Sequence, residues 1–334
     1  MNENAELRLG LIGCGRIGVV HAEAIGRAEG ARLVAVSDAV PDASAALADI
    51  HGAEERDAHD LISSPDIDAV VIASPTSTHA DLAEAAARAG KAIFCEKPID
   101  LSAERAEACR AVVEAAGVPF LTAFQRRFDP HIADLAARLH AGEIGRPELV
   151  VLSSRDPGPP PVSYIATSGG IYRDMMIHDF DVARFLLGEE PIAVHATGAC
   201  LVDPAIADAG DVDTAAVTLR TARGAICQIT CSRRASYGYD QRIEVHGETG
   251  MLSMDNLRKS LVARSDGAGM TQSPSKYSFL ERYADAYAAE MHYFVAQLRA
   301  GAPLGPDARD GVMALKIADA ATLSAAEGRV VEIR

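Results

Sequence analysis

The sequence contains neither a Cys-x-x-Cys pair nor an apolar run of about 18 residues. The absence of paired cysteines favours buried free thiols in a reducing compartment over a metal or disulfide site. The lack of a long apolar run argues against a membrane-spanning helix. The first residues are acidic and show no signal-peptide pattern, so we expect a cytoplasmic protein. The six cysteines, most of them inside apolar runs, are Cys14, Cys95, Cys109, Cys200, Cys227 and Cys231.

Basic residues are in short supply, with 32 Lys and Arg against 47 Asp and Glu and a formal net charge of −15. A surface this acidic repels phosphate backbones and anionic lipid, which argues against nucleic acid or membrane partners. Internal repeats and low-complexity tracts are also lacking. What is present is the composition of an ordinary globular protein, 49% hydrophobic and 24% charged, over 334 residues. That length predicts two domains.

The beginning of the chain follows the pattern of a dinucleotide-binding unit. An apolar strand is predicted over residues 7–12, and Gly13-Cys-Gly-Arg-Ile-Gly18 follows it at once. A helical pattern then covers about 17–28, and a second strand over 32–37 ends at Asp38. A glycine motif placed between a strand and a helix is far more specific than the motif alone.

Each glycine of this motif has a separate physical purpose. Gly13 permits the tight turn, Gly15 lets the backbone approach a pyrophosphate, and Gly18 allows close packing of helix and strand. The helix that begins at about Ile17, just after Arg16, directs its unpaired N–H groups at the diphosphate. We therefore expect these five residues to bind the cofactor.

Asp38 indicates which dinucleotide is bound. It lies 20 residues after Gly18, where an acid can hold the ribose hydroxyls. Ala39 and Val40 follow it, so no adjacent cation is available for a 2′-phosphate. The pattern favours NAD over NADP. The alternative is a glycine-rich turn followed by an exposed aspartate.

Strands and helices continue to alternate through the first half. Strands are predicted over 69–73, 91–95 and 118–123, and helices over 81–89 and 102–116. This alternation predicts a parallel, doubly wound sheet whose ligand binds beyond the carboxyl ends of the strands.

Two loops leave such strand ends and are candidates for ligand contact. The first contains Ser74, Thr76 and His79, and the second is Glu96-Lys97-Pro98. We expect Ser74, Thr76, His79, Glu96 and Lys97 to contribute to cofactor binding. Other interpretations are open at this point: a solvated charge for Lys97, a loop cap for Glu96, and a helix-start residue for His79.

The second half has a different organisation, because the alternation stops near Gln125. Helices are predicted over 131–140, 174–187, 283–299 and 307–327. The strand-like segments between them follow one another directly, at 192–200, 214–219, 225–231, 241–246, 251–254 and 261–264. They predict a largely antiparallel open sheet with helices on one face. The fold class is thus α/β plus α+β, with a Rossmann domain over 1–123 and a substrate-binding and oligomerisation domain over 124–334. An open sheet usually finds a partner, so we expect a homo-oligomer.

The segment Arg173-Asp-Met-Met-Ile-His-Asp-Phe-Asp181 carries the clearest catalytic pattern. In a helix, Asp174, His178 and Asp181 would lie on one stripe at i, i+4 and i+7. A histidine oriented by a carboxylate through one ring nitrogen can accept a proton at the other. The alternative is a helix-start carboxylate with a hydrogen-bonded core histidine.

Taken together, these motifs resemble the Gfo/Idh/MocA oxidoreductases over essentially the whole chain. The carrying segments are Gly13–Gly18, Glu96–Pro98, 126–130, 154–157, 168–170, 174–181, 210–214, 232–242 and 281–287. Tyr237-Gly-Tyr-Asp-Gln-Arg242 is similar to the inositol-oxidising branch in particular. Ala123-Phe-Gln125 departs from the common family pattern beside the substrate pocket.

The resemblance implies a reaction and a set of residues for it. It implies NAD-dependent oxidation of a secondary hydroxyl of a cyclic polyol, myo-inositol to 2-keto-myo-inositol (scyllo-inosose), as in inositol catabolism. It implies that Lys97 reaches between nicotinamide and substrate, that Asp174 and His178 form the acid–base pair, and that no metal takes part. It also implies a tetramer. The further residues that the resemblance places at the polyol pocket are Arg127, Asp156, Asp181 and Tyr237.

Three alternative functions are compatible with the same motifs. The first is the same chemistry on another sugar, such as an aldose or a deoxy- or amino-sugar. The second is an NAD-retaining glycosidase, which oxidises, eliminates and re-reduces. The third is a sugar-sensing regulator without turnover, which the joint presence of Lys97, Asp174 and His178 disfavours.

Overall fold

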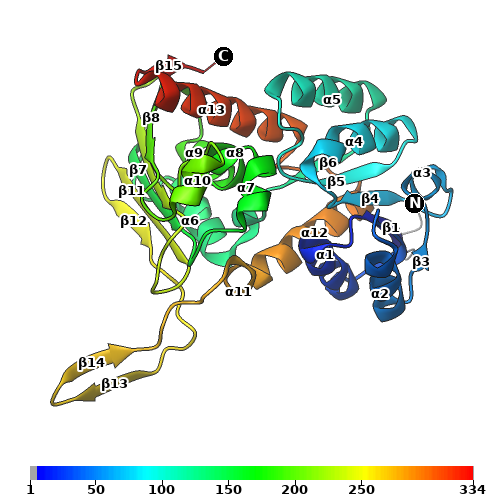
Figure 1. Ribbon diagram of the computed structural model, residues 1–334, viewed down its shortest axis with the longest axis horizontal. Helices are drawn as coiled ribbons and strands as arrows, with labels where there is room; N and C mark the ends of the chain where they lie inside the picture. The colour runs from blue at the N-terminus through cyan, green and yellow to red at the C-terminus, as the bar shows by residue number, and fades with distance from the viewer. Residues whose placement is uncertain (1–5, 334) are drawn as a thin grey trace. The chain divides into compact units, whose positions relative to one another are not determined.

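The computed structural model describes residues 6–333 and divides into two compact units, coloured along the chain in Figure 1. The first unit contains the chain up to Phe128 together with Asp285–Leu315. The second contains Asp129–Ala284 and the chain from Lys316 onward. The predicted division after residue 123 thus differs from the observed one, which lies slightly later and returns a distant segment to the first unit.

Helix α12 (Ala284–Ala300) explains this return. Its side chains Met291, Phe294 and Val295 are buried in the same apolar cluster as the first strands of the chain. The ring of Phe294 meets Phe94 edge to face with centroids 5.4 Å apart. Because the helix completes that core, it belongs with a unit whose other elements precede it by more than 150 residues.

The first unit is built on a six-stranded sheet in the order β3-β2-β1-β4-β5-β6. All neighbouring strands are parallel, which confirms the predicted doubly wound Rossmann sheet. Figure 1 shows α4 and α5 on one side of the sheet and α1, α2 and α12 on the other. The strands are β1 (Leu7–Ile12), β2 (Ala31–Ser37), β3 (Glu54–Glu55), β4 (Ala69–Ile72), β5 (Ala92–Glu96) and β6 (Phe120–Ala123).

The helices of this unit begin and end at recognisable caps. Ser102 accepts a hydrogen bond from the Arg105 N–H at the start of α5, and Gly117 ends the helix with a left-handed φ of 65°. The sequence analysis did not predict α2 and α3. The helices are α1 (Arg16–Arg27), α2 (Pro41–His51), α3 (Ala58–Ser63), η1 (Thr76–Thr78), α4 (His79–Arg88), α5 (Ala103–Ala116) and η2 (Gln125–Phe128).

The second unit contains a seven-stranded sheet in the order β12-β11-β7-β10-β9-β8-β15. Its pairs are antiparallel except for β7 with β10, so the predicted largely antiparallel sheet is confirmed as a mixed one. The strands are β7 (Pro147–Arg155), β8 (Pro191–Ala199), β9 (Thr214–Thr221), β10 (Ile226–Ser232), β11 (Asp240–Gly247), β12 (Met251–Met254) and β15 (Val331–Glu332).

Strand β7 was missed by the sequence analysis, although it is central to this sheet. Its inward residues Val150, Leu152 and Ser154 are buried, whereas the residues between them are partly exposed. The four successive apolar residues 149–152 hide this alternation in the sequence. β7 is also the strand that carries Arg155 and Asp156 to the end of the sheet.

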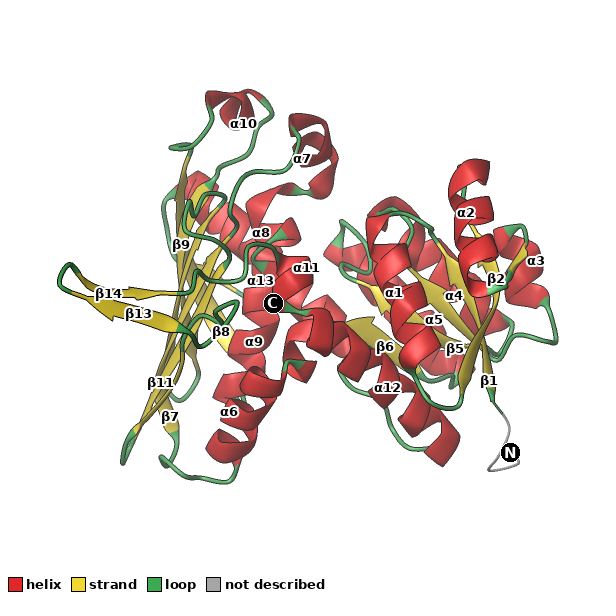
Figure 2. Cartoon of the chain, turned by 90° about the horizontal axis from the view of Figure 1, so that it is seen from below, coloured by secondary structure: helices red, strands yellow, loops and turns green. Residues whose placement is uncertain are grey.

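Helices cover one face of the second sheet, and the other face is open (Figure 2). The apolar cluster of this unit joins α6, α8, α9 and the end of α13 to the inward strand residues. The opposite residues, such as Gln228 and Thr230 of β10, are exposed. The helices are α6 (Pro130–His140), α7 (Val162–Ser168), α8 (Gly170–Asp174), α9 (Ile177–Leu187), α10 (Pro204–Asp208), α11 (Phe279–Arg282) and α13 (Ala308–Glu327).

The segment predicted as a strand over 261–264 has a different place. It leads into β13 (Ala263–Asp266), which pairs only with β14 (Gly269–Gln272) as a separate hairpin. Both views show this hairpin projecting from the sheet of the second unit (Figures 1 and 2).

Within residues 6–333, no helix has the length and apolar character that crossing a membrane requires.

Candidate active site

The glycine turn after β1 has the geometry predicted for it. Gly13 has a left-handed φ of 101°, and a Cβ there would lie 2.4 Å from the backbone of Ala73. A Cβ on Gly18 would lie 1.9 Å from the Gly13 carbonyl oxygen. At Gly15, by contrast, a Cβ would meet nothing within 4 Å. Two glycines are therefore required by packing, whereas Gly15 leaves open space over the turn.

Asp38 closes this turn from the end of β2. Its carboxylate accepts hydrogen bonds from the Cys14 N–H at 2.6 Å and from the Val40 N–H at 2.8 Å. Helix α1 begins at Arg16 with no side-chain cap, so its first N–H groups are directed at the open space. An uncapped helix end, an open glycine and a fixed acid fit the diphosphate and ribose of NAD.

The loop after β4 is held by its own hydroxyl groups and by a histidine. Ser74 Oγ and Thr78 Oγ1 share a hydrogen bond of 2.6 Å, and Thr76 begins the short helix η1. His79 is buried, and both of its ring nitrogens contact backbone carbonyls. The structure thus places Ser74, Thr76 and His79 at the carboxyl end of β4, where the Rossmann fold binds its ligand.

The Glu96-Lys97-Pro98 loop leaves the neighbouring strand β5. Glu96 Oε1 accepts a hydrogen bond of 2.8 Å from His21 Nε2, and Oε2 accepts one of 3.1 Å from the Lys97 N–H. Burial alone would raise the pKa of Glu96, but the hydrogen bond from His21 and nearby positive charges outweigh it and lower that pKa. His21 was missed by the sequence analysis. Its position on the buried face of α1, one turn after Gly18, was the only signal.

In the second unit, the predicted continuous helix over 174–187 is wrong. Helix α8 ends at Asp174, and α9 begins at Ile177. The Met176 N–H bonds to the Ile171 carbonyl five residues earlier, so the chain makes one widened turn between the two helices. Asp174 and His178 therefore belong to successive helices rather than to one stripe.

The Asp174 carboxylate is fixed by two side chains that the sequence analysis did not assign. Tyr164 donates its hydroxyl to Oδ1 at 2.9 Å, and Arg233 approaches Oδ2 at 3.4 Å. Arg233 is 1% exposed and also pairs with Asp211 at 3.3 Å. The buried guanidinium thus holds two carboxylates together. Arg233 could be found only as one letter of the 232–242 motif.

The other predicted pocket residues have varied surroundings. Arg127 pairs with Asp310 at 3.1 Å within the first unit. In the second unit, Asp156 donates its backbone N–H to the Ser232 carbonyl. Asp181 is fully buried, and its carboxylate lies 3.7 Å from the Arg184 guanidinium. Its contact with substrate stays a prediction.

Tyr237 is half exposed, and its hydroxyl donates to Asp240 at 2.6 Å. Asp240 is buried and also accepts from Arg155, Arg242 and Asn256. Burial would raise the pKa of Asp240, but these hydrogen bonds outweigh it and hold the pKa well below its ordinary value. Asp240 thus orders the segment that most resembles the inositol-oxidising branch.

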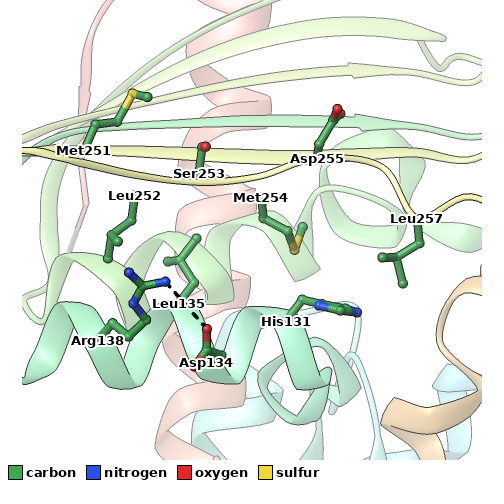
Figure 3. A pocket seen from close by; sticks show the side chains of 10 residues that line it. All are labelled: His131, Asp134, Leu135, Arg138, Met251, Leu252, Ser253, Met254, Asp255 and Leu257. Atoms are coloured by element: carbon green, nitrogen blue, oxygen red, sulfur yellow. Dashed lines mark ion pairs between the residues drawn. The ribbon is translucent and has the colours of Figure 1, made fainter. Parts of the chain in front are cut away.

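A separate cavity of about 450 Å³ lies between α6 and β12 in the second unit (Figure 3). None of the predicted site residues lines it. An ion pair of 3.9 Å between Asp134 and Arg138 runs along its helical wall. Its lining residues are His131, Asp134, Leu135, Arg138, Met251, Leu252, Ser253, Met254, Asp255 and Leu257.

Within residues 6–333 no cluster of three or more His, Cys, Asp or Glu side chains could hold a metal ion.

The Rossmann unit with its glycine turn and acid, joined to a mixed α/β unit, defines an NAD-binding oxidoreductase. The family model for the oxidoreductase NAD-binding Rossmann fold matches residues 7–124. The model for the C-terminal alpha/beta domain of the same family matches residues 136–333. The chain therefore belongs to the Gfo/Idh/MocA oxidoreductase family, which confirms the predicted resemblance.

Several relatives of known name match over the full length. The inositol 2-dehydrogenase of Rhizobium meliloti is 53% identical over 98% of this chain and 99% of its own. The solved myo-inositol dehydrogenase of Corynebacterium glutamicum is 43% identical, with a TM-score of 0.94 over 98% of this chain and 99% of its own. A scyllo-inositol dehydrogenase of Lactobacillus casei, solved with bound NAD(H) and scyllo-inositol, is 32% identical, with a TM-score of 0.92 and the same coverage.

Proposed function

We propose that this chain is an NAD-dependent inositol 2-dehydrogenase that oxidises myo-inositol to 2-keto-myo-inositol. One observation carries the proposal: the residues expected for this reaction occur in a chain 53% identical, over 98% of its length, to an inositol 2-dehydrogenase. The related enzyme with bound NAD(H) and scyllo-inositol supports the same pairing of cofactor and substrate class. A physiological setting in inositol catabolism, in the cytoplasm, belongs to this proposal.

His178 is the proposed base, and Asp174 the residue that orients it. Oxidation of a secondary alcohol requires removal of the hydroxyl proton as the C–H hydride leaves. A neutral imidazole accepts that proton. Asp174 can serve as a fixed partner, because Tyr164 and Arg233 hold its carboxylate in place.

Lys97 is the proposed stabiliser of the developing alkoxide. Its ammonium donates a hydrogen bond to the same oxygen, which lowers the energy of the charged transition state. The fixed contact between the Lys97 N–H and Glu96 gives this lysine a defined starting position.

The residues that would hold NAD are Gly13, Gly15, Gly18 and Asp38, together with the start of α1. When bound, NAD supplies the hydride acceptor.

The polyol is proposed to be recognised by Arg127, Asp156, Asp181 and Tyr237. A neutral substrate with a hydroxyl on every carbon needs many directed hydrogen bonds, which charged and phenolic side chains can supply. Tyr237 is the member whose place is best defined, because its hydroxyl is anchored to the buried Asp240.

A panel of inositol isomers and hexoses, assayed with NAD and with NADP, tests the proposal. We expect NADH to accumulate with myo-inositol at a higher kcat/KM than with any hexose, and little turnover with NADP. A hexose preferred over every inositol would contradict the proposed substrate. Cleavage of a glycoside with no net NADH would instead identify the family's glycosidase chemistry.

The oligomer is proposed to be a homotetramer built through the open face of the second sheet. That face exposes alternate strand residues, among them the apolar Ile226 and Met251. Their burial between copies would be favourable. Light scattering at micromolar concentration should give a multiple of the 35.1 kDa chain mass. A clean monomer would contradict this part of the proposal.

A further inference from the structure

Three buried titratable side chains surround the start of the Glu96-Lys97-Pro98 loop. His21 is 0% exposed, His79 is 2% exposed and Glu96 is 8% exposed. They come from α1, from the first residue of α4 and from the last residue of β5, all within the first unit. Buried ionisable groups are costly unless their charges and hydrogen bonds are matched. The hydrogen-bond partners of each group therefore indicate what it does in the fold.

His21 links α1 to Glu96 through one ring nitrogen. Its Nε2 donates to the Glu96 carboxylate at 2.8 Å. Its Nδ1 is buried and has no hydrogen-bond partner among residues 6–333. The contact with Glu96 is therefore the hydrogen bond that fixes this ring. The rings of Phe94 and Tyr287 enclose the imidazole edge to face, at 4.9 and 5.9 Å.

His79 contacts two loops at once. Its Nδ1 lies 2.8 Å from the Pro98 carbonyl oxygen, and its Nε2 lies 2.7 Å from the Ser74 carbonyl oxygen. His79 is thus a link between the loop after β4 and the loop after β5.

Glu96 joins His21 to the backbone of Lys97. Burial alone would raise the pKa of Glu96, but the hydrogen bond from His21 and nearby charges outweigh it and lower that pKa. The Glu96 carboxylate also accepts the Lys97 N–H at 3.1 Å. Its two contacts thus connect α1 to the start of the loop.

We propose that His21, Glu96 and His79 form a positioning cluster that fixes the backbone of Lys97 relative to the two cofactor loops. His21 ties Glu96 to the helix that follows the glycine turn, and His79 ties Pro98 to Ser74. The cluster thus acts on Lys97 through the backbone, in addition to the cofactor contacts expected of His79 and Glu96. This inference rests on the proposed role of Lys97 in polyol oxidation.

Kinetics of His21→Leu and His79→Leu provide the first test. A misplacement of about 1 Å at a reacting group costs roughly 10²-fold in rate. We expect kcat to fall about 10²-fold in each variant, with the Kd for NAD within a few-fold of the original in His21→Leu. NAD affinity should persist because the turn itself is fixed by Asp38 and Cys14.

His21→Gln is the rescue variant, because its amide can still donate to Glu96. It should keep kcat within a few-fold of the original. His59→Leu, at an exposed histidine of α3, is the matched control and should change nothing. A simple loss of folding would lower the melting temperature, NAD affinity and kcat together. That outcome, or an unchanged kcat in the leucine variants, would overturn the proposal.

Crystal structures of the same variants test the cluster without reference to turnover. We expect the 96–98 loop to shift in His21→Leu and His79→Leu while β5 and the glycine turn stay in place. An unmoved loop would overturn the proposal. If the original protein oxidises no polyol, the proposed function fails, and the loop position alone then decides whether the cluster positions Lys97.

Discussion

His178 is the residue on which the proposed proton transfer depends. We predict that His178→Ala lowers kcat by about 10²- to 10⁴-fold, the usual contribution of a general base. The Kd for NAD should barely change, because the cofactor turn lies wholly within the first unit. Steady-state kinetics and calorimetry measure both quantities. His292→Ala, at an exposed position of α12, is the control. An unchanged kcat in His178→Ala would refute the role.

Asp38 is the residue that should select the cofactor. Asp38→Ala removes a carboxylate that fixes the glycine turn through Cys14 and is placed to accept the ribose hydroxyls. Hydrogen bonds to charged groups contribute about 1.5–3 kcal/mol, so the Kd for NAD should rise roughly tenfold to hundredfold. Asp42→Ala on the exposed side of α2 should leave the Kd unchanged. Equal NAD binding by both variants would contradict the assignment.

Local spacing predicted the geometry of residues that lie close together in the chain. The glycines and Asp38 lie within 26 positions of one another, and their pattern determines their geometry. His21 and Arg233 were missed because their partners are distant: Glu96 lies 75 positions after His21, and Asp174 lies 59 before Arg233. A single buried histidine or arginine carries no signal until the fold supplies its carboxylate.

Among the elements, Arg233 lies in the loop after β10 and connects two other segments. It contacts Asp174 at the end of α8 and Asp211 just before β9. Removing one partner of a buried ion pair leaves uncompensated charge and costs about 3–5 kcal/mol. We predict that Arg233→Met lowers the free energy of unfolding by about 3 kcal/mol and also lowers kcat. Urea denaturation measures the first effect. Arg234→Met is a matched control, because Arg234 is next to Arg233 in the chain but its side chain is exposed. Equal stability of the two variants would contradict this account.

Asp213 stabilises the segment between β8 and β9 in a pH-dependent way. It is buried and accepts the N–H groups of Leu201, Val202 and Asp203. Burial would raise its pKa, but these bonds outweigh it and lower the pKa to about 2. Because the pKa of Asp213 is lower in the folded protein than its unfolded value of about 3.9, the carboxylate stabilises the fold at pH values above about 3.9. That stabilisation is lost as the pH falls toward 2.

We therefore predict that Asp213→Asn lowers the free energy of unfolding by about 2 kcal/mol at pH 7. Between pH 4 and pH 2, the free energy of unfolding of this variant should fall less steeply than that of the original protein. Denaturant melts across that pH range provide the measurement. Asp208→Asn, at an exposed position of α10, should retain the original slope. A slope in Asp213→Asn identical to that of the original protein would show that another group is responsible.

Elements with strong patterns were predicted closely, and the remaining elements show why patterns fail. Five strands of the first sheet were predicted because both faces are buried and each reads as an apolar run, whereas the exposed two-residue β3 was not. The helix over 174–187 was wrong because a single widened turn at Met176 leaves no signature in the apolar spacing. Strand β7 was missed because its alternation of buried and exposed residues begins inside the apolar run 149–152.

For the whole molecule, the two-unit plan was predictable and its exact division was not. The change from alternating strands and helices to successive strands marks the second unit. The return of α12 to the first core could not be read from order along the chain, because it depends on which core its apolar face completes. Family membership rests on models that match both units.

Transfer of hydride from C2 of myo-inositol to NAD is the step on which the proposed function depends, and isotope labelling follows that step. Myo-inositol deuterated at C2 would be incubated with the protein and NAD, and the reduced nicotinamide analysed by mass spectrometry. We predict one deuterium in each reduced nicotinamide and a ketone at C2 of the product. Reduced cofactor without deuterium, or no reduced cofactor from a protein that binds NAD, would contradict the proposed function.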